Sequence, residues 1–167
     1  SLNLLKLNLV MGLRSWSQVA LPSFLPLWLA QEGHPPTLAG GLLTVYLISG
    51  AAGGFVGGWL GDRLGRKTCI ITCLAVSLPA MFVFLHSRET SALAWIMLAI
   101  SGGALQGTLP SSIVWAQEMI PANAAMASGM MLGLAFGLGG AGAAVTGALA
   151  DCVGLRTALY WSLLPLA

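Results

Sequence analysis

Long apolar runs, separated by short breaks, dominate this chain of 167 residues. A helix that crosses the hydrocarbon core of a bilayer, which is about 30 Å thick, needs about 20 apolar residues. Five runs reach that length and a sixth is shorter. The breaks hold Gly, Pro and most of the charged residues, which is typical of turns between helices. The pattern predicts an all-α membrane protein with five full spans and a truncated sixth, at residues 9–30, 38–60, 68–85, 93–116, 124–150 and 155–167.

Composition supports the membrane class and excludes several others. Hydrophobic residues make up 57% of the chain, charged residues only 7%, and the mean hydropathy is +0.87. Ordinary globular domains carry about 25% charged residues, so these few charges cannot form a water-facing surface. The net charge of +2 and the lack of a long basic run exclude nucleic acid as a partner.

No residue pattern indicates catalysis or a bound cofactor. Cys69, Cys73 and Cys152 form neither a CxxC pair nor a Cys/His cluster, so we expect no metal site and no structural disulfide. The sequence also lacks a nucleotide-binding loop and any arrangement of nucleophile and base. We therefore expect a protein that is not an enzyme and needs no cofactor.

The cations are unequally shared between the two sides of the predicted bundle. In membrane proteins the side richer in Lys and Arg is cytoplasmic. One side collects four of them, with Arg14 near the same end of its helix, and the other side holds Arg88 and Arg156. The cytoplasmic set is Lys6, Arg63, Arg66 and Lys67.

The break after the second run carries a recognisable motif. Residues 58–67 read Gly58-Trp-Leu-Gly-Asp62-Arg63-Leu-Gly65-Arg66-Lys67. This stretch resembles the signature loop of the major facilitator superfamily, G-x-L-a-D-r-x-G-r-k, with Gly61 where a small residue, often Ala, is usual. The resemblance implies a cytoplasmic loop between two helices of a six-helix half, which agrees with the charge distribution.

The same resemblance implies a conformational role for the motif, carried by Gly58, Asp62, Arg63, Gly65, Arg66 and Lys67. Asp62 would pair with Arg66 and face the N-terminus of the fifth helix, near Asn123, when the cytoplasmic gate is shut. A carboxylate at that end of a helix dipole gains about 0.3–1 kcal/mol. The alternative is that the cations serve membrane topology alone.

Four further stretches are similar to one branch of the superfamily, the fosmidomycin-resistance proteins, which are proton-driven drug exporters. They lie at residues 116–121, 127–129, 134–140 and 148–155, and the resemblance covers nearly the whole chain from Val10 onward. The signature is best known from the N-terminal half of such transporters. The match at residues 117–140 and the abrupt start of the chain nevertheless favour the C-terminal half.

The resemblance therefore implies helices seven to twelve of a twelve-helix major facilitator fold, with the N-terminal half absent and the chain a fragment of a longer protein. The expected partners are a small-molecule substrate, protons as the coupling ion, the lipid bilayer and the N-terminal half. We expect a multi-pass protein of the bacterial inner membrane that exports a drug such as fosmidomycin by antiport and alternating access. The alternatives are an uptake symporter for a sugar or organic anion, and a non-transporting receptor or scaffold.

Four polar residues in or near the apolar runs are candidates for the substrate or proton pathway. Arg14 and Gln18 lie one turn apart on one helix face. An arginine at the bilayer centre costs about 2.5–3.5 kcal/mol, so Arg14 either faces the bundle cavity and a partner or extends to the cytoplasmic interface. Glu118 either carries the exchanged proton or has a structural role, in which it pairs with a loop cation or caps the fifth helix. Gln106 either bonds between helices or lines the cavity.

Glycine recurs every four residues in the fifth run, at Gly129, Gly133 and Gly137, and again at Gly140. Such spacing forms a strip on which another backbone approaches closely. The strip serves either helix packing or a smooth contact on which helices rock. The second run repeats the pattern with Gly50, Gly53, Gly54, Gly57 and Gly58.

Overall fold

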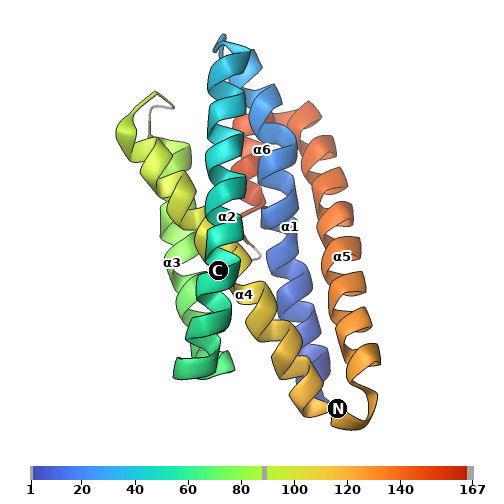
Figure 1. The fold of residues 1–167 in the computed structure, drawn as a ribbon. Helices are drawn as coiled ribbons and strands as arrows, with labels where there is room; N and C mark the ends of the chain where they lie inside the picture. Colours follow the sequence, from blue (N-terminus) through green and yellow to red (C-terminus); the bar gives the residue numbers. More distant parts are fainter. Residues whose placement is uncertain (1, 88–89, 165–167) are drawn as a thin grey trace.

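A computed structural model describes residues 2–87 and 90–164, and every regular element in this part of the chain is helical (Figure 1). The elements are, in order, α1 (Leu2–Gln31), α2 (Pro36–Leu64), α3 (Arg66–His86), α4 (Ala92–Met119), the 3₁₀ helix η1 (Pro121–Asn123), α5 (Ala124–Val153) and α6 (Leu155–Trp161).

Four helical segments in the described residues have both the length and the apolar content to cross a membrane: α2, α3, α4 and η1 with α5. They correspond to four of the five predicted full spans. At 30 residues, or about 45 Å, α1 is also long enough, but Lys6, Arg14 and Gln18 lower its hydropathy. With 7 residues, α6 is about 10 Å long and too short to span. The end of the predicted sixth run, residues 165–167, lies outside the described residues.

The break predicted at residues 61–67 is almost entirely helical, which corrects the expected loop. Helix α2 continues through Leu64, and α3 begins at Arg66. Only Gly65 departs from helical geometry, with a φ of 91°, a conformation that glycine adopts without a steric penalty. Apolar runs mark the hydrocarbon thickness, whereas backbone hydrogen bonds keep a chain helical beyond it. The signature residues are therefore held on two rigid helix ends.

Three helix pairs form most of the packing: α2 with α4, α1 with α5, and α3 with α4. Helix α4 also contacts α1 and α5, so it joins the two sides of the bundle (Figure 1). The contact between α2 and α4 is a backbone approach. A Cβ atom on Gly53 would overlap the backbone of Gly103, and one on Gly57 would overlap that of Gly107. The close approach predicted from the glycines of the second run is confirmed.

The glycine strip of α5 behaves differently. Apart from the nearby backbone of α5 itself, no atom of the described residues lies within 4 Å of the position where a Cβ would stand on Gly129, Gly133, Gly137 or Gly140. Helix α5 instead packs on α1 through Gly139 and Gly142, where an added Cβ would meet Val19 and Trp16. The expected packing of the strip is therefore not made by the described residues. Glycines occur on two faces of α5, and their spacing alone does not say which face meets α1.

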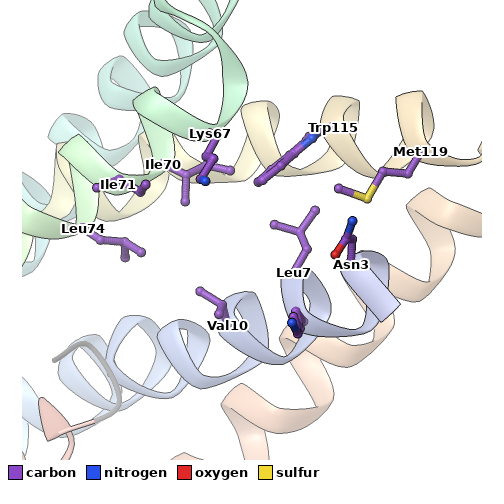
Figure 2. A pocket seen from close by; sticks show the side chains of 10 residues that line it. Asn3, Leu7, Val10, Lys67, Ile70, Ile71, Leu74, Trp115 and Met119 are labelled. Carbon is purple, nitrogen blue, oxygen red and sulfur yellow. The ribbon is translucent and has the colours of Figure 1, made fainter. Parts of the chain in front are cut away.

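A groove of about 610 Å³ lies between the N-terminal ends of α1 and α3, with α4 as its floor. Figure 2 shows Leu7 and Val10 on one wall and Ile70 opposite, with Trp115 behind them. Near the other ends of α1 and α3, α6 packs into the core through Leu155 and Leu159, and Leu163, two residues beyond α6, joins them. The groove is lined mainly by apolar side chains.

Candidate functional site

The most deeply buried charge of the described residues is Arg14, twelve residues after the start of α1, which is about 18 Å along the helix. Its side chain is only 1% exposed. Its Nη2 atom donates hydrogen bonds to the backbone oxygen of Leu105, at 2.7 Å, and to the side chain of Gln18. Its Nε and Nη1 atoms have no hydrogen-bond partner among the described residues. Arg14 thus lies inside the bundle and does not extend to the helix end.

Gln18 connects Arg14 to the opposite wall. Its carbonyl oxygen accepts from Arg14, and its amide nitrogen donates to the side-chain oxygen of Gln106 on α4. The hydroxyl of Tyr46 on α2 lies 3.5 Å from the backbone oxygen of Gln18. Three of the four candidate pathway residues therefore form one hydrogen-bonded chain, Arg14–Gln18–Gln106, which we call the polar chain.

The polar chain ends at a concave surface. A hollow of about 210 Å³ is lined by Gln18, Tyr46 and Gln106, together with small and apolar residues of α1, α2 and α4. It shares Ala51 and Gln106 with a neighbouring hollow of about 430 Å³ between α2 and α4. Together the two form a trough with polar groups at one end. Tyr46 was not among the sequence candidates, although a buried tyrosine hydroxyl usually has a polar partner and could have indicated it.

Arg14 has no acidic neighbour in the described part of the chain. All four carboxylates described there are exposed and lie at or just beyond the ends of helices, at Glu32, Asp62, Glu118 and Asp151. The bonds that Arg14 makes are to neutral oxygens. A desolvated charge of this kind is costly unless a counter-charge reaches it, and charged groups inside membrane proteins mark substrate or ion pathways.

A second cluster joins three helix ends on the predicted cytoplasmic side. Arg66, at the start of α3, pairs with Asp62 at 2.5 Å and with Glu118, near the end of α4, at 3.5 Å. The Arg66 side chain is 19% exposed, whereas the two carboxylates are more than half exposed. The structure thus places Glu118 with the signature residues and apart from the polar chain. Exposed pairs of this type contribute about 0.2–1 kcal/mol each.

The other signature residues surround this cluster. Arg63 lies over the ring of Trp59, 4.3 Å from its centre, and Lys67 lines the groove of Figure 2. A Cβ on Gly58 would just touch Pro110 of α4. Asp62 has its ion pair with Arg66, while α5 packs mainly on α1. The predicted approach of Asp62 to the start of α5, near Asn123, stays a prediction.

We find no group of three His, Cys, Asp or Glu side chains that could hold a metal ion within residues 2–87 and 90–164. The larger apolar groove of Figure 2 offers two cations, Lys6 and Lys67, but no hydrogen-bonded polar network. The polar chain and the Asp62–Arg66–Glu118 cluster are therefore the two candidate functional centres.

Comparison with known proteins decides the family. The sequence model of the Major Facilitator Superfamily matches residues 7–167, nearly the whole chain. The chain belongs to the major facilitator superfamily. Members of this superfamily are transporters and not enzymes, and the chain is part of a multi-pass integral membrane protein. Its bacterial relatives indicate the inner membrane.

Two curated relatives of this major facilitator chain are informative. The "Uncharacterized MFS-type transporter YfnC" of Bacillus subtilis (strain 168) is 35% identical over 117 residues, which is 70% of this chain and 28% of that protein. The "Fosmidomycin resistance protein" of Escherichia coli (strain K12) is 43% identical over 56 residues, 34% of this chain and 14% of that protein. The chain thus matches less than a third of the length of either relative.

Proposed function

We propose that this chain is the C-terminal half of a proton-coupled exporter that moves a small molecule, such as the drug fosmidomycin, by alternating access. The observation that carries the proposal is the buried polar chain from Arg14 to Gln106, which ends at an open trough. A membrane protein holds such a costly group where a substrate or ion passes. The likeness to the fosmidomycin resistance protein supplies the candidate substrate.

In this proposal the N-terminal half forms the opposite wall of the pathway. Substrate sites of such transporters lie near the bilayer midplane, at the interface between structural repeats. The open glycine face of α5 would meet the other half, because none of the described residues packs against its four glycines. A smooth glycine surface allows two helices to slide while they stay in contact.

The Asp62–Arg66–Glu118 cluster is proposed to be the cytoplasmic gate. It ties together the ends of α2, α3 and α4, so separation of these ion pairs would free the cytoplasmic ends of the three helices to move. Protonation of Glu118 would remove its charge and weaken its pair with Arg66. In this way a proton carried on Glu118 would favour one conformation, and its release to the cytoplasm would favour the other.

The test uses the full-length parent protein in everted membrane vesicles, in which respiration acidifies the interior. We expect fosmidomycin to raise the internal pH, because drug enters in exchange for protons. Asp62→Asn should abolish this drug-dependent change, and Asp151→Asn, which neutralises an exposed carboxylate at the far end of α5, should leave it intact.

A lack of proton movement with fosmidomycin and with a panel of other drugs would refute the export proposal. The alternative of uptake symport for a sugar or organic anion is favoured by one observation, since the uncompensated charge of Arg14 suits an anion moving in either direction. Substrate-linked acidification of right-side-out vesicles would support that reading. A non-transporting receptor or scaffold would tolerate Arg14→Ala and Asp62→Asn with no transport phenotype at all.

A further inference from the structure

Gln18 occupies an unusual position, because its neutral carbonyl oxygen accepts from a buried guanidinium that has no carboxylate nearby. We propose that Gln18 is a stand-in acceptor, which an oxyanion of the substrate replaces on Arg14. The transporter would then select small molecules that carry a carboxylate- or phosphate-type group. This inference rests on the proposed transport function and adds the substrate class and the residue that sets it.

The charge balance requires an acceptor of this kind. An arginine keeps its charge in proteins, and the carboxylates of the described residues all lie at the helix ends. Leu105 and Gln18 satisfy only Nη2, while Nε and Nη1 are left without a bond. An oxyanion would supply the counter-charge and an acceptor for one of these two nitrogens.

The geometry allows the exchange. Nη2 belongs to both of the guanidinium edges that bind an oxyanion through two parallel hydrogen bonds, which is the preferred contact of arginine with carboxylate and phosphate. Gln18 now takes one hydrogen of that atom. Once Gln18 moves away, an edge of the guanidinium becomes available.

An oxyanion would reach Arg14 from the side of the hollow. Gln18, Gln106 and Tyr46 line it, so a molecule there would contact the side chain that covers Arg14. On the α5 side, the void beside Arg14 measures only about 10 Å³. This is room for a single water molecule at most. The bond between Gln18 and Gln106 gives the displaced amide a partner on the opposite wall.

The decisive variant is Gln18→Glu, which places a permanent carboxylate on Arg14. We would purify the full-length transporter and measure thermal unfolding with fosmidomycin, a phosphonic acid, with its neutral diethyl ester, and with other pairs of an acid and its ester. For the wild type we expect acids to raise the unfolding temperature and esters to have little effect. Gln18→Glu should unfold at a higher temperature without ligand and bind the acids about tenfold more weakly or worse.

Two further variants complete the comparison. Gln106→Glu adds the same charge to the hollow without contacting Arg14, and should weaken acid binding less than Gln18→Glu does. Arg14→Gln should remove the preference for acids over esters. A Gln18→Glu protein that binds acids as the wild type does would overturn the inference, and so would a wild type that no acid stabilises more than its ester.

The second possible source of an oxyanion is an acidic side chain of the N-terminal half. In that case Arg14→Gln would lower the unfolding temperature of the ligand-free protein and leave the ratio of acid to ester binding unchanged, which also overturns the inference. Failure of the proposed function is recognised separately. Preferential binding of acids without drug-dependent proton movement in vesicles would refute export and leave the substrate class standing.

Discussion

Arg66 forms one ion pair that the sequence motif predicts and a second that depends on the tertiary structure. The signature predicts its pair with Asp62, four residues earlier, because the two residues share a helical face. The pair with Glu118 joins residues 52 positions apart and depends on how α4 lies against α3. Two roles for Glu118 are therefore compatible with the sequence, and only the fold places Glu118 beside Arg66.

At the residue scale, we predict that Arg66→Gln loosens the cytoplasmic end of the bundle. It removes two ion pairs worth about 0.2–1 kcal/mol each. This corresponds to an increase of about 2- to 30-fold in the fraction of molecules whose cytoplasmic helix ends are apart. The reporter is Cys69, fully buried one turn away, with its thiol 3.4 Å from the backbone oxygen of Gly57. In a full-length protein with Cys73→Ser and Cys152→Ser, N-ethylmaleimide should label Cys69 faster by that factor.

Arg63→Gln is the matched control for this labelling experiment. It removes a neighbouring cation that stacks on Trp59, outside the cluster, and should leave the labelling rate unchanged. Equal acceleration in both variants would mean that the cations act through net charge alone, and the gate proposal would lose its basis.

At the scale of elements, glycines spaced four residues apart allow close packing on one helix, α2, and leave an open face on another, α5. On α2 the glycine strip lies against α4. A hydrogen bond of 3.0 Å from the hydroxyl of Ser111 to the backbone oxygen of Gly57 stabilises this contact. On α5 the strip predicted from the sequence is open. A spacing of four residues identifies a face of a helix but not the neighbour of that face, which depends on the rotation of the helix about its axis.

This difference predicts unequal effects of one substitution at two glycines. Gly57→Val would force a side chain into the backbone of Gly107, and overpacking of this kind costs about 1–3 kcal/mol or more. A Cβ on Gly133 meets no other helix in the described part of the chain, so Gly133→Val should leave the folding of this half unchanged. We expect Gly57→Val to lower the unfolding temperature and the yield of folded protein in detergent, as measured by fluorescence-detected size-exclusion chromatography.

The same pair of variants tests the role of the open face in transport. If that face meets the N-terminal half, Gly133→Val in the full-length protein should fold with normal yield and transport poorly. Normal transport by Gly133→Val would show that this part of α5 makes no close contact during the cycle.

At the scale of the whole molecule, the trough beside the polar chain forms one wall of a pathway. Gln18, Tyr46 and Gln106 line a hollow that adjoins a second one between α2 and α4. The stretches that match this chain make up 28% and 14% of its two curated relatives. A complete pathway needs a second wall that excludes lipid from these polar groups.

We therefore predict that this chain alone does not transport. When it is expressed in cells without its partner half, vesicles should show no proton movement in response to fosmidomycin. Co-expression with the N-terminal half as a separate polypeptide should restore the response. Drug-linked proton movement by the isolated chain would contradict the half-transporter interpretation.

The class, the helices and the family of this protein can be read from its amino-acid sequence without the fold. Low charge and long apolar runs leave a bilayer as the only suitable solvent, and within it a helix satisfies its own backbone hydrogen bonds. Helix positions were therefore readable from local composition, with errors mainly at the ends, as at residues 61–64. The signature motif was readable because its residues are contiguous.

Which residues contact one another depends instead on how the helices pack. Arg14 bonds to the backbone oxygen of Leu105, 91 residues away, and Gln18 bonds to Gln106, 88 residues away. Such contacts depend on the rotation and crossing of helices that are each apolar on nearly every side. Hydrophobic periodicity therefore carries little information about which face is inside. Packing of small residues and the placement of a few polar groups decide it instead.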